Sequence, residues 1–166
     1  DVRHILAATA RRVNASQTAI TQPYFGSSFT LEQGWVLNAG GYWYHNWYGF
    51  GLVNAAAAVA MAQTYTAGSL GTFVAETKSA AIGTTNIDFG STGLTKTFAI
   101  AGTSPTTVEQ AELTLYFGSG YQPICHQIEL SSPAGTKSIV LNMDSAHTSA
   151  STNGVRFMSN AFYGEP

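Results

Sequence analysis

The sequence predicts a mixed fold, with two helices and an aromatic loop in residues 1–67 and an all-β region in residues 68–166. In the first region, apolar residues recur at helical spacing. After Gly68 they alternate with polar residues in short runs separated by Gly, Ser, Pro and Asn. No helical window follows residue 68. An antiparallel sandwich is therefore the expected architecture of the second region.

Residues 1–13 predict an amphipathic helix, because Val2 and Ile5 belong to an apolar stripe at helical spacing. We expect the Asp1 carboxylate to serve the N-terminus of this helix. The Arg11–Arg12 pair would lie at the negative end of the helix dipole.

Residues 14–49 predict a packed loop rich in aromatic side chains, and the run from Phe50 to Tyr65 predicts a second helix. That helix is mostly alanine with Leu, Val and Met, so it has almost no polar face and requires burial on most sides. A region of this size buries only about 60% of its surface. The sequence therefore predicts that the alanine-rich helix needs a partner outside residues 1–67.

The clearest strand is predicted over Ala111–Phe117, where apolar and polar residues alternate strictly. A hairpin is predicted next. Its first strand contains Ile128 and Leu130, residues 132–136 form its turn, and the alternation resumes at Ile139.

Composition excludes several functional classes. Among 166 residues, 10% are charged and 45% are apolar, which argues against intrinsic disorder. The net charge is −2 and the basic residues are scattered, so we expect no nucleic-acid partner. No apolar run approaches the roughly 20 residues of a membrane span. Cys125 is the single cysteine, so no internal disulfide forms. Surface polarity from Ser, Thr, Asn and Gln favours a secreted or periplasmic protein.

Two stretches of the first region resemble a known family. They are W-x-x-N-A-G, from Trp35 to Gly40, and Y-G-F-G-L-V-N-A, from Tyr48 to Ala55. Together they resemble the closing segment of the catalytic domain of subtilisin-like serine proteases of the kexin and furin type. The resemblance covers residues 1 to about 67 and implies that this region is the remnant of an α/β domain.

Two stretches of the second region resemble the P domain, the jelly-roll-like β-sandwich that follows the catalytic domain in proprotein convertases. They are S-P-A-G-T-K-S, from Ser132 to Ser138, and F-M-S-N-A-F-Y-G-E, from Phe157 to Glu165. The resemblance covers about residues 72–165. The motif residues to which it gives structural roles are Trp35, Asn38, Gly49, Phe50, Gly51, Ser132, Pro133, Gly135, Thr136, Phe157, Ser159, Gly164 and Glu165.

The resemblance implies a C-terminal fragment of an exported serine endopeptidase, in which the P domain stabilises the catalytic domain. The partner of this chain would then be the rest of that catalytic domain, in the same parent protein. We expect the chain alone to lack the Asp, His and Ser triad and to be inactive, and its P domain to lack the last strands. Such proteases often bind calcium, but the acidic residues here are too sparse to predict a calcium or other metal site.

Candidate catalytic residues receive structural interpretations instead. Ser104 belongs to a G-T-S tripeptide like that of subtilisin-like nucleophiles, but Pro105 follows at once and the next residues have strand periodicity, so we expect an ordinary turn. His126 follows Cys125, yet neighbours on a strand point to opposite faces. We expect His4 to be solvated and His45 to be packed among aromatic side chains. Asp144 and His147 are interpreted as part of a surface turn.

A second functional hypothesis comes from the aromatic residues between Trp35 and Phe50. Exposed Trp and Tyr faces stack on sugar rings, so the chain would be a stand-alone β-sandwich binding module for glycans or cell-surface partners. We expect a buried aromatic plug, because the adjoining helix also requires burial. Exposure of Trp43 and Trp47 distinguishes the two hypotheses.

Overall fold

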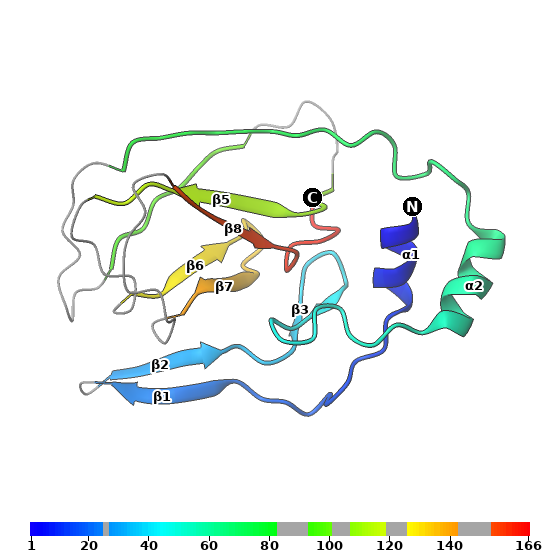
Figure 1. Cartoon of the computed structure of the whole chain (residues 1–166), viewed down its shortest axis with the longest axis horizontal. Coiled ribbons are helices and arrows are strands. Elements are labelled where there is room, and N and C mark those ends of the chain that lie inside the picture. Colours follow the sequence, from blue (N-terminus) through cyan, green and yellow to red (C-terminus); the bar gives the residue numbers. More distant parts are fainter. Residues whose placement is uncertain (25–26, 83–92, 101–106, 119–125, 143–153) are drawn as a thin grey trace.

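Two helices lie at one end of the molecule, and pairs of short antiparallel strands fill the rest (Figure 1). In this computed structural model, the described residues are 1–24, 27–82, 93–100, 107–118, 126–142 and 154–166. Helix α1 (Val2–Thr9) lies between the strands and helix α2 (Ala55–Thr64), so α2 is the outermost element at that end. No helix in the described ranges is long and apolar enough to cross a membrane.

Helix α1 ends four residues earlier than the sequence predicts. Its apolar stripe does face the interior, since Ile5 and Ala7 are buried. The backbone then becomes extended at Ala10, and Arg11 forms a two-way backbone pair with Leu52 at 2.9 and 2.8 Å. The expected place of the arginine pair at the helix end is therefore wrong, because hydrogen bonding between distant segments outweighs local helix propensity.

The Asp1 carboxylate does not cap α1, contrary to our expectation. Its two oxygens instead accept hydrogen bonds from the backbone N–H of Gly68 at 2.9 Å and the hydroxyl of Tyr65 at 3.3 Å. Asp1 thus connects the beginning of α1 to the segment that follows α2.

Helix α2 begins at Ala55, because the Asn54 side chain accepts a hydrogen bond from the Ala57 N–H at 3.2 Å and caps the helix. Phe50 therefore precedes the helix rather than lying in its first turn. Gly51 has a φ of +118°, and a Cβ there would collide with the Arg11 carbonyl. Only glycine allows this close approach between the two segments.

Residues 14–49 contain strands where the sequence predicts a loop. Strand β1 (Ile20–Tyr24) pairs with β2 (Ser27–Glu32), and β3 (Val36–Leu37) pairs with β4 (Trp43–Tyr44). The β1–β2 ribbon projects below the other strands (Figure 1).

The second region contains the strand and the hairpin that the sequence predicts after residue 110, whereas the described residues 68–82 and 93–100 form no strand. Strand β5 (Ala111–Leu115) pairs with β8 (Val155–Ser159), and β6 (Ile128–Ser131) pairs with β7 (Lys137–Leu141). The predicted hairpin is the β6–β7 pair. In the described ranges the strands form four two-stranded antiparallel sheets. The complete sandwich stays a prediction, as does the division into domains at residue 67.

Both regions of the chain contribute buried apolar residues. They come from α1, α2, β7 and the turn after β8, namely Ile5, Ala7, Ala58, Ile139, Leu141, Ala161, Phe162 and Tyr163. The C-terminal turn lies beside α1, because His4 Nδ1 is 2.9 Å from the Tyr163 hydroxyl.

Candidate functional site at the junction of the two regions

Asn38, at the end of β3, joins the first region to the last residues of the chain. Its side chain is buried and donates hydrogen bonds to the carbonyl oxygens of Ala161 at 2.9 Å and Tyr163 at 2.8 Å. Its own oxygen accepts the Tyr42 N–H at 2.8 Å. All three polar functions of this amide are satisfied, so Asn38 fixes the β3–β4 turn against the C-terminal turn.

Glu165, in the C-terminal turn, connects back to the first region. Its carboxylate is buried and accepts hydrogen bonds from the Ala39 N–H at 3.0 Å and the Thr136 hydroxyl. The Glu165 carbonyl also accepts the N–H of Val108 at 2.8 Å. One acidic residue therefore holds the β3–β4 turn, the β6–β7 turn and the segment before β5. Hydrogen bonds to a charged acceptor are stronger than neutral ones.

The two backbones cross in contact at Gly40 and Gly164. A Cβ at Gly40 would lie 2.5 Å from the carbonyl carbon of Gly164. A Cβ at Gly164, where φ is +79°, would lie 2.6 Å from the Tyr42 ring. No side chain fits at either position.

The remaining motif residues support these turns and strands. Ser159 shares a buried hydroxyl hydrogen bond with Ser138 at 2.7 Å, which links β8 to β7. Phe157 lies half-buried opposite Leu113 on β5. The β6–β7 turn contains Ser132, Pro133 and Gly135, with a φ of +89° at Gly135. The structure thus brings Asn38, Thr136, Gly164 and Glu165 into one cluster and leaves the other motif residues around it.

Aromatic rings extend the junction towards α1. His4 Nδ1 lies 2.9 Å from the Tyr163 hydroxyl, and the Tyr163 ring meets those of Tyr42 and Phe50 edge to face, with centroids 4.9 and 5.4 Å apart. Burial raises the pKa of Tyr163 to about 12. These rings form the packed part of the predicted plug.

His45 is the centre of a second aromatic cluster. Its ring is fully buried against Trp35, Trp47 and Tyr48, with centroids 5.3, 5.6 and 4.6 Å away. Burial lowers the pKa of His45, although the neighbouring Glu32 opposes the shift. His45 Nδ1 accepts a hydrogen bond from the backbone N–H of Trp47 at 3.0 Å. The indole N–H of Trp35 donates to the Val13 carbonyl at 3.0 Å. His45 has the packing role that the sequence predicts.

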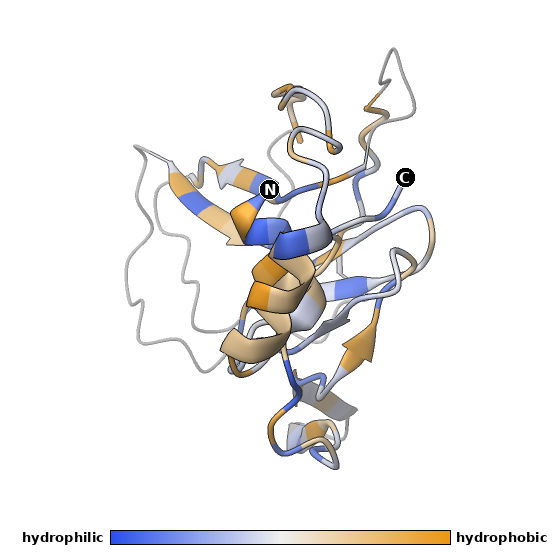
Figure 2. Ribbon diagram, turned by 90° about the vertical axis from the view of Figure 1, so that its right-hand side faces the viewer, coloured by the Kyte–Doolittle hydropathy of each residue, from blue (hydrophilic) through white to orange (hydrophobic). Residues whose placement is uncertain are grey.

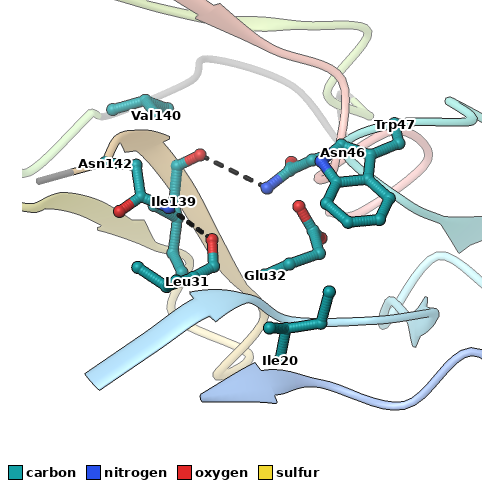
Figure 3. A pocket seen from close by; sticks show the side chains of 8 residues that line it. All are labelled: Ile20, Leu31, Glu32, Asn46, Trp47, Ile139, Val140 and Asn142. Carbon is teal, nitrogen blue, oxygen red and sulfur yellow. Dashed lines mark hydrogen bonds between the residues drawn. The ribbon is translucent and has the colours of Figure 1, made fainter. Parts of the chain in front are cut away.

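Trp43 and Trp47 are exposed, so the expectation that the plug would bury them is wrong. Trp43 is 37% exposed and is covered by the Arg12 guanidinium, 3.9 Å from the ring centroid. Trp47 is 58% exposed at the edge of an open cleft of about 460 Å³ between β2 and β7 (Figure 3). The residues lining this cleft are Ile20, Leu31, Glu32, Asn46, Trp47, Ile139, Val140 and Asn142. Nothing in the sequence pattern singles out Glu32.

His4 and His45 make structural contacts rather than catalytic ones. Neither His4 nor His45 is hydrogen-bonded to a serine hydroxyl of the described residues. Ser104, Cys125, Asp144 and His147 lie outside the described residues. No group of three or more His, Cys, Asp or Glu residues suited to a metal ion occurs within the described ranges.

Helix α2 leaves an apolar surface uncovered, as the sequence predicts. Only Ala58 is buried on this helix, whereas Val59 is 59% exposed, and Leu52 and Val53 just before the helix are 52% and 61% exposed. Figure 2 is turned by 90° from Figure 1 so that α2 faces the viewer, and most of this helix is coloured as hydrophobic, with polar residues only in its last turn. We call Leu52, Val53 and Val59 the α2 face.

Comparison with known proteins identifies close counterparts of the whole chain. The Aeromonas extracellular serine protease of Aeromonas sobria is 31% identical over 191 residues, and the match covers 99% of this chain and 29% of that protein. The microbial serine proteinase of Aeromonas salmonicida is 31% identical over 194 residues, covering 100% of this chain and 30% of that protein. The chain is homologous to part of a serine protease.

The solved structures agree with the sequence comparison. The crystal structure of the Aeromonas sobria serine protease matches with a TM-score of 0.69 at 26% identity, and its complex with a chaperone matches with a TM-score of 0.69 at 25% identity. Each match covers 99% of this chain and 30% of the protease. No protein-family profile matches the chain. This chain therefore spans about 30% of the length of the Aeromonas proteases that it matches.

Proposed function

We propose that the chain is the C-terminal part of an exported, subtilisin-like serine endopeptidase. Residues 1–67 complete the catalytic domain, and residues 68–166 form a P domain that stabilises it. The exposed α2 face is the observation that carries this proposal. Homology to about 30% of the Aeromonas proteases supports it, because the remaining part of such a protease is large enough to cover that face.

The energetics favour a cover for the α2 face. Full burial of a Val or Leu side chain contributes about 1.5–3 kcal/mol, and the α2 face holds three such residues within eight positions. A monomer rarely leaves so apolar a helix in water. The cover is the preceding part of the catalytic domain, and the extracellular Aeromonas relative supports export of the parent.

The second region would stabilise the first through the hydrogen bonds at their junction. Asn38 and Glu165 tie the β3–β4 turn to the C-terminal turn through buried hydrogen bonds. Any loosening of residues 107–165 is therefore transmitted to the segment that leads into α2. Catalysis belongs to the preceding part of the parent, and calcium, where the parent binds it, belongs there too.

The test is to read the coding sequence that precedes Asp1 in the source DNA and to express the complete reading frame. We expect Asp, His and Ser codons in a subtilisin-like order, and a secreted product whose upstream serine reacts with a fluorophosphonate probe. The 166-residue chain expressed alone should remain unlabelled. A reading frame without that triad, or labelling of Ser104 in the isolated chain, contradicts the proposal.

The second candidate function is a stand-alone glycan-binding module, which the exposure of Trp47 favours. The covering of Trp43 by Arg12 argues against it, because one open indole is a small platform. A glycan array probed with the whole chain separates the two functions. Saturable binding that the Trp47→Ala variant loses supports the module.

A further inference from the structure

The cleft beside Trp47 is lined by both apolar and polar side chains. Its long walls are β2 and β7, and two amide side chains span it (Figure 3). Asn142 donates to the Leu31 carbonyl at 2.5 Å, and Asn46 donates to the Ile139 carbonyl at 3.5 Å. Ligand pockets commonly enclose about 300–1,000 Å³, and this cleft is within that range at about 460 Å³.

Glu32 places a buried carboxylate in the cleft, and no Lys or Arg of the described residues pairs with it. The residue is 3% exposed, and the carboxylate points towards Asn46 and Trp47 (Figure 3). Oε1 accepts the Gln33 N–H at 3.0 Å, whereas Oε2 accepts no hydrogen bond from the residues that the structure describes. A buried carboxylate needs either a cation or further donors, because its desolvation is costly.

His45 does not supply that cation. Its Nδ1 lies 4.0 Å from Glu32 Oε1, but the same nitrogen accepts the Trp47 N–H and therefore carries no proton. Burial also lowers the pKa of His45, which keeps the ring neutral near pH 7. No Lys or Arg among the described residues forms an ion pair with Glu32 within 4.0 Å.

We propose that the cleft binds a lysine or arginine side chain presented by another polypeptide. The cationic group would pair with Glu32 and lie against the exposed indole of Trp47. The aliphatic stem would lie along Ile20 and Ile139, since long basic side chains pack their methylene groups on apolar surface. Charge complementarity selects this occupant over a sugar, whose hydroxyl groups leave the carboxylate unneutralised.

This inference goes beyond the proposed function and does not depend on it. It concerns β2, β7 and the loop after β4, whereas the proposed function rests on the α2 face and on the preceding sequence. A failure of either leaves the other intact.

The test measures binding of short peptides to the whole chain by calorimetry and by tryptophan fluorescence. The probes are Ac-Gly-Arg-Gly-NH2 and Ac-Gly-Lys-Gly-NH2, with the neutral citrulline peptide Ac-Gly-Cit-Gly-NH2 as the matched control. We expect the arginine peptide to bind about ten-fold or more tightly than the citrulline peptide, because a charged hydrogen bond is lost. The Glu32→Gln variant should remove that difference.

Two exposed tryptophans, one at the cleft and one away from it, provide a matched pair of variants. Trp47→Ala should weaken binding of the arginine peptide several-fold, whereas Trp43→Ala, away from the cleft, should leave it unchanged. Equal affinity for the arginine and citrulline peptides, or absence of binding by both basic peptides, overturns the proposal. So does saturable binding of a neutral oligosaccharide that is lost in Trp47→Ala. The peptide comparison needs no variant, so it decides the question even when Glu32→Gln does not fold.

Discussion

The backbone N–H of Ala39 donates a hydrogen bond to Oε1 of Glu165 at 3.0 Å, although 126 positions separate the two residues in the sequence. The same carboxylate accepts the Thr136 hydroxyl. Together with the hydrogen bonds of Asn38, this contact links the aromatic turns of the first region directly to the C-terminal turn. It makes the stability of residues 1–67 depend on the last residues of the chain.

Replacing Glu165 with Gln should therefore lower the free energy of unfolding by about 1–3 kcal/mol, because the amide presents an N–H₂ group to a site built of donors. Urea unfolding monitored by circular dichroism measures the change. Glu76→Gln, at an exposed position, is the matched control and should change the free energy by less than about 0.5 kcal/mol. Equal effects of the two substitutions would contradict the role of Glu165.

The backbone crossing predicts strong discrimination between two glycines. Gly40→Ala should destabilise the chain by about 2 kcal/mol or more, because the new methyl group meets the backbone of Gly164 and nothing flexible can move aside. Gly118→Ala adds the same methyl group with no neighbouring atom within 4 Å, so it should be neutral. Differential scanning calorimetry of both variants checks this expectation, which fails if Gly40→Ala melts like the unaltered chain.

Stability should depend on pH through His45. Burial lowers the pKa of this ring below its ordinary 6.5, so the unfolded chain binds the proton first as the pH falls. The contribution of neutral His45 to the free energy of unfolding is therefore complete above about pH 6.5, and it decreases as the pH falls towards the folded-state pKa. Urea titrations between pH 7.5 and pH 5 should show a shallower decrease for His45→Gln. Equal slopes for the unaltered chain and His45→Gln would contradict this prediction.

Adjacent positions on α2 should respond differently to the same change. Val59→Asn, on the exposed α2 face, should alter the unfolding free energy of the 166-residue chain by less than about 0.5 kcal/mol. Ala58→Asn places an amide in the buried contact with α1 and should cost about 1–3 kcal/mol. In the complete reading frame, Val59→Asn should also become destabilising by a similar amount. Thermal melting of both forms provides the comparison.

Local patterns of the sequence predicted much of this arrangement. The strand over 111–117 and the hairpin at 128–143 follow from alternation and turn residues, and the structure forms them as β5 and the β6–β7 pair. The alanine-rich run predicted both a helix and its incomplete cover, since composition alone fixes how little polar surface α2 has. In each case the signal lies within a few consecutive residues.

The unpredicted features depend on contacts between distant residues. Pairing of Arg11 with Leu52 ends α1, and pairing of β1 with β2 orders a segment that composition describes only as a loop. Family resemblance indicated a structural role for Asn38 and for the motif that contains Tyr163. The spacing of residues in the sequence cannot predict the hydrogen bond between them. Glu32 lies in an ordinary polar stretch, and only the folded chain shows that its carboxylate is buried.

The crossing of Gly40 and Gly164 also restricts how such proteins can be recombined. A chimera that transfers residues 107–166 to another host needs a host turn with glycine at the crossing and an asparagine two residues before it. Without both residues, the final turn of the transplanted segment has neither the space nor the hydrogen-bond donor that Gly40 and Asn38 provide. Exchange of one region without the other is thus hindered, and we expect the residues on the two sides of the crossing to change together in evolution.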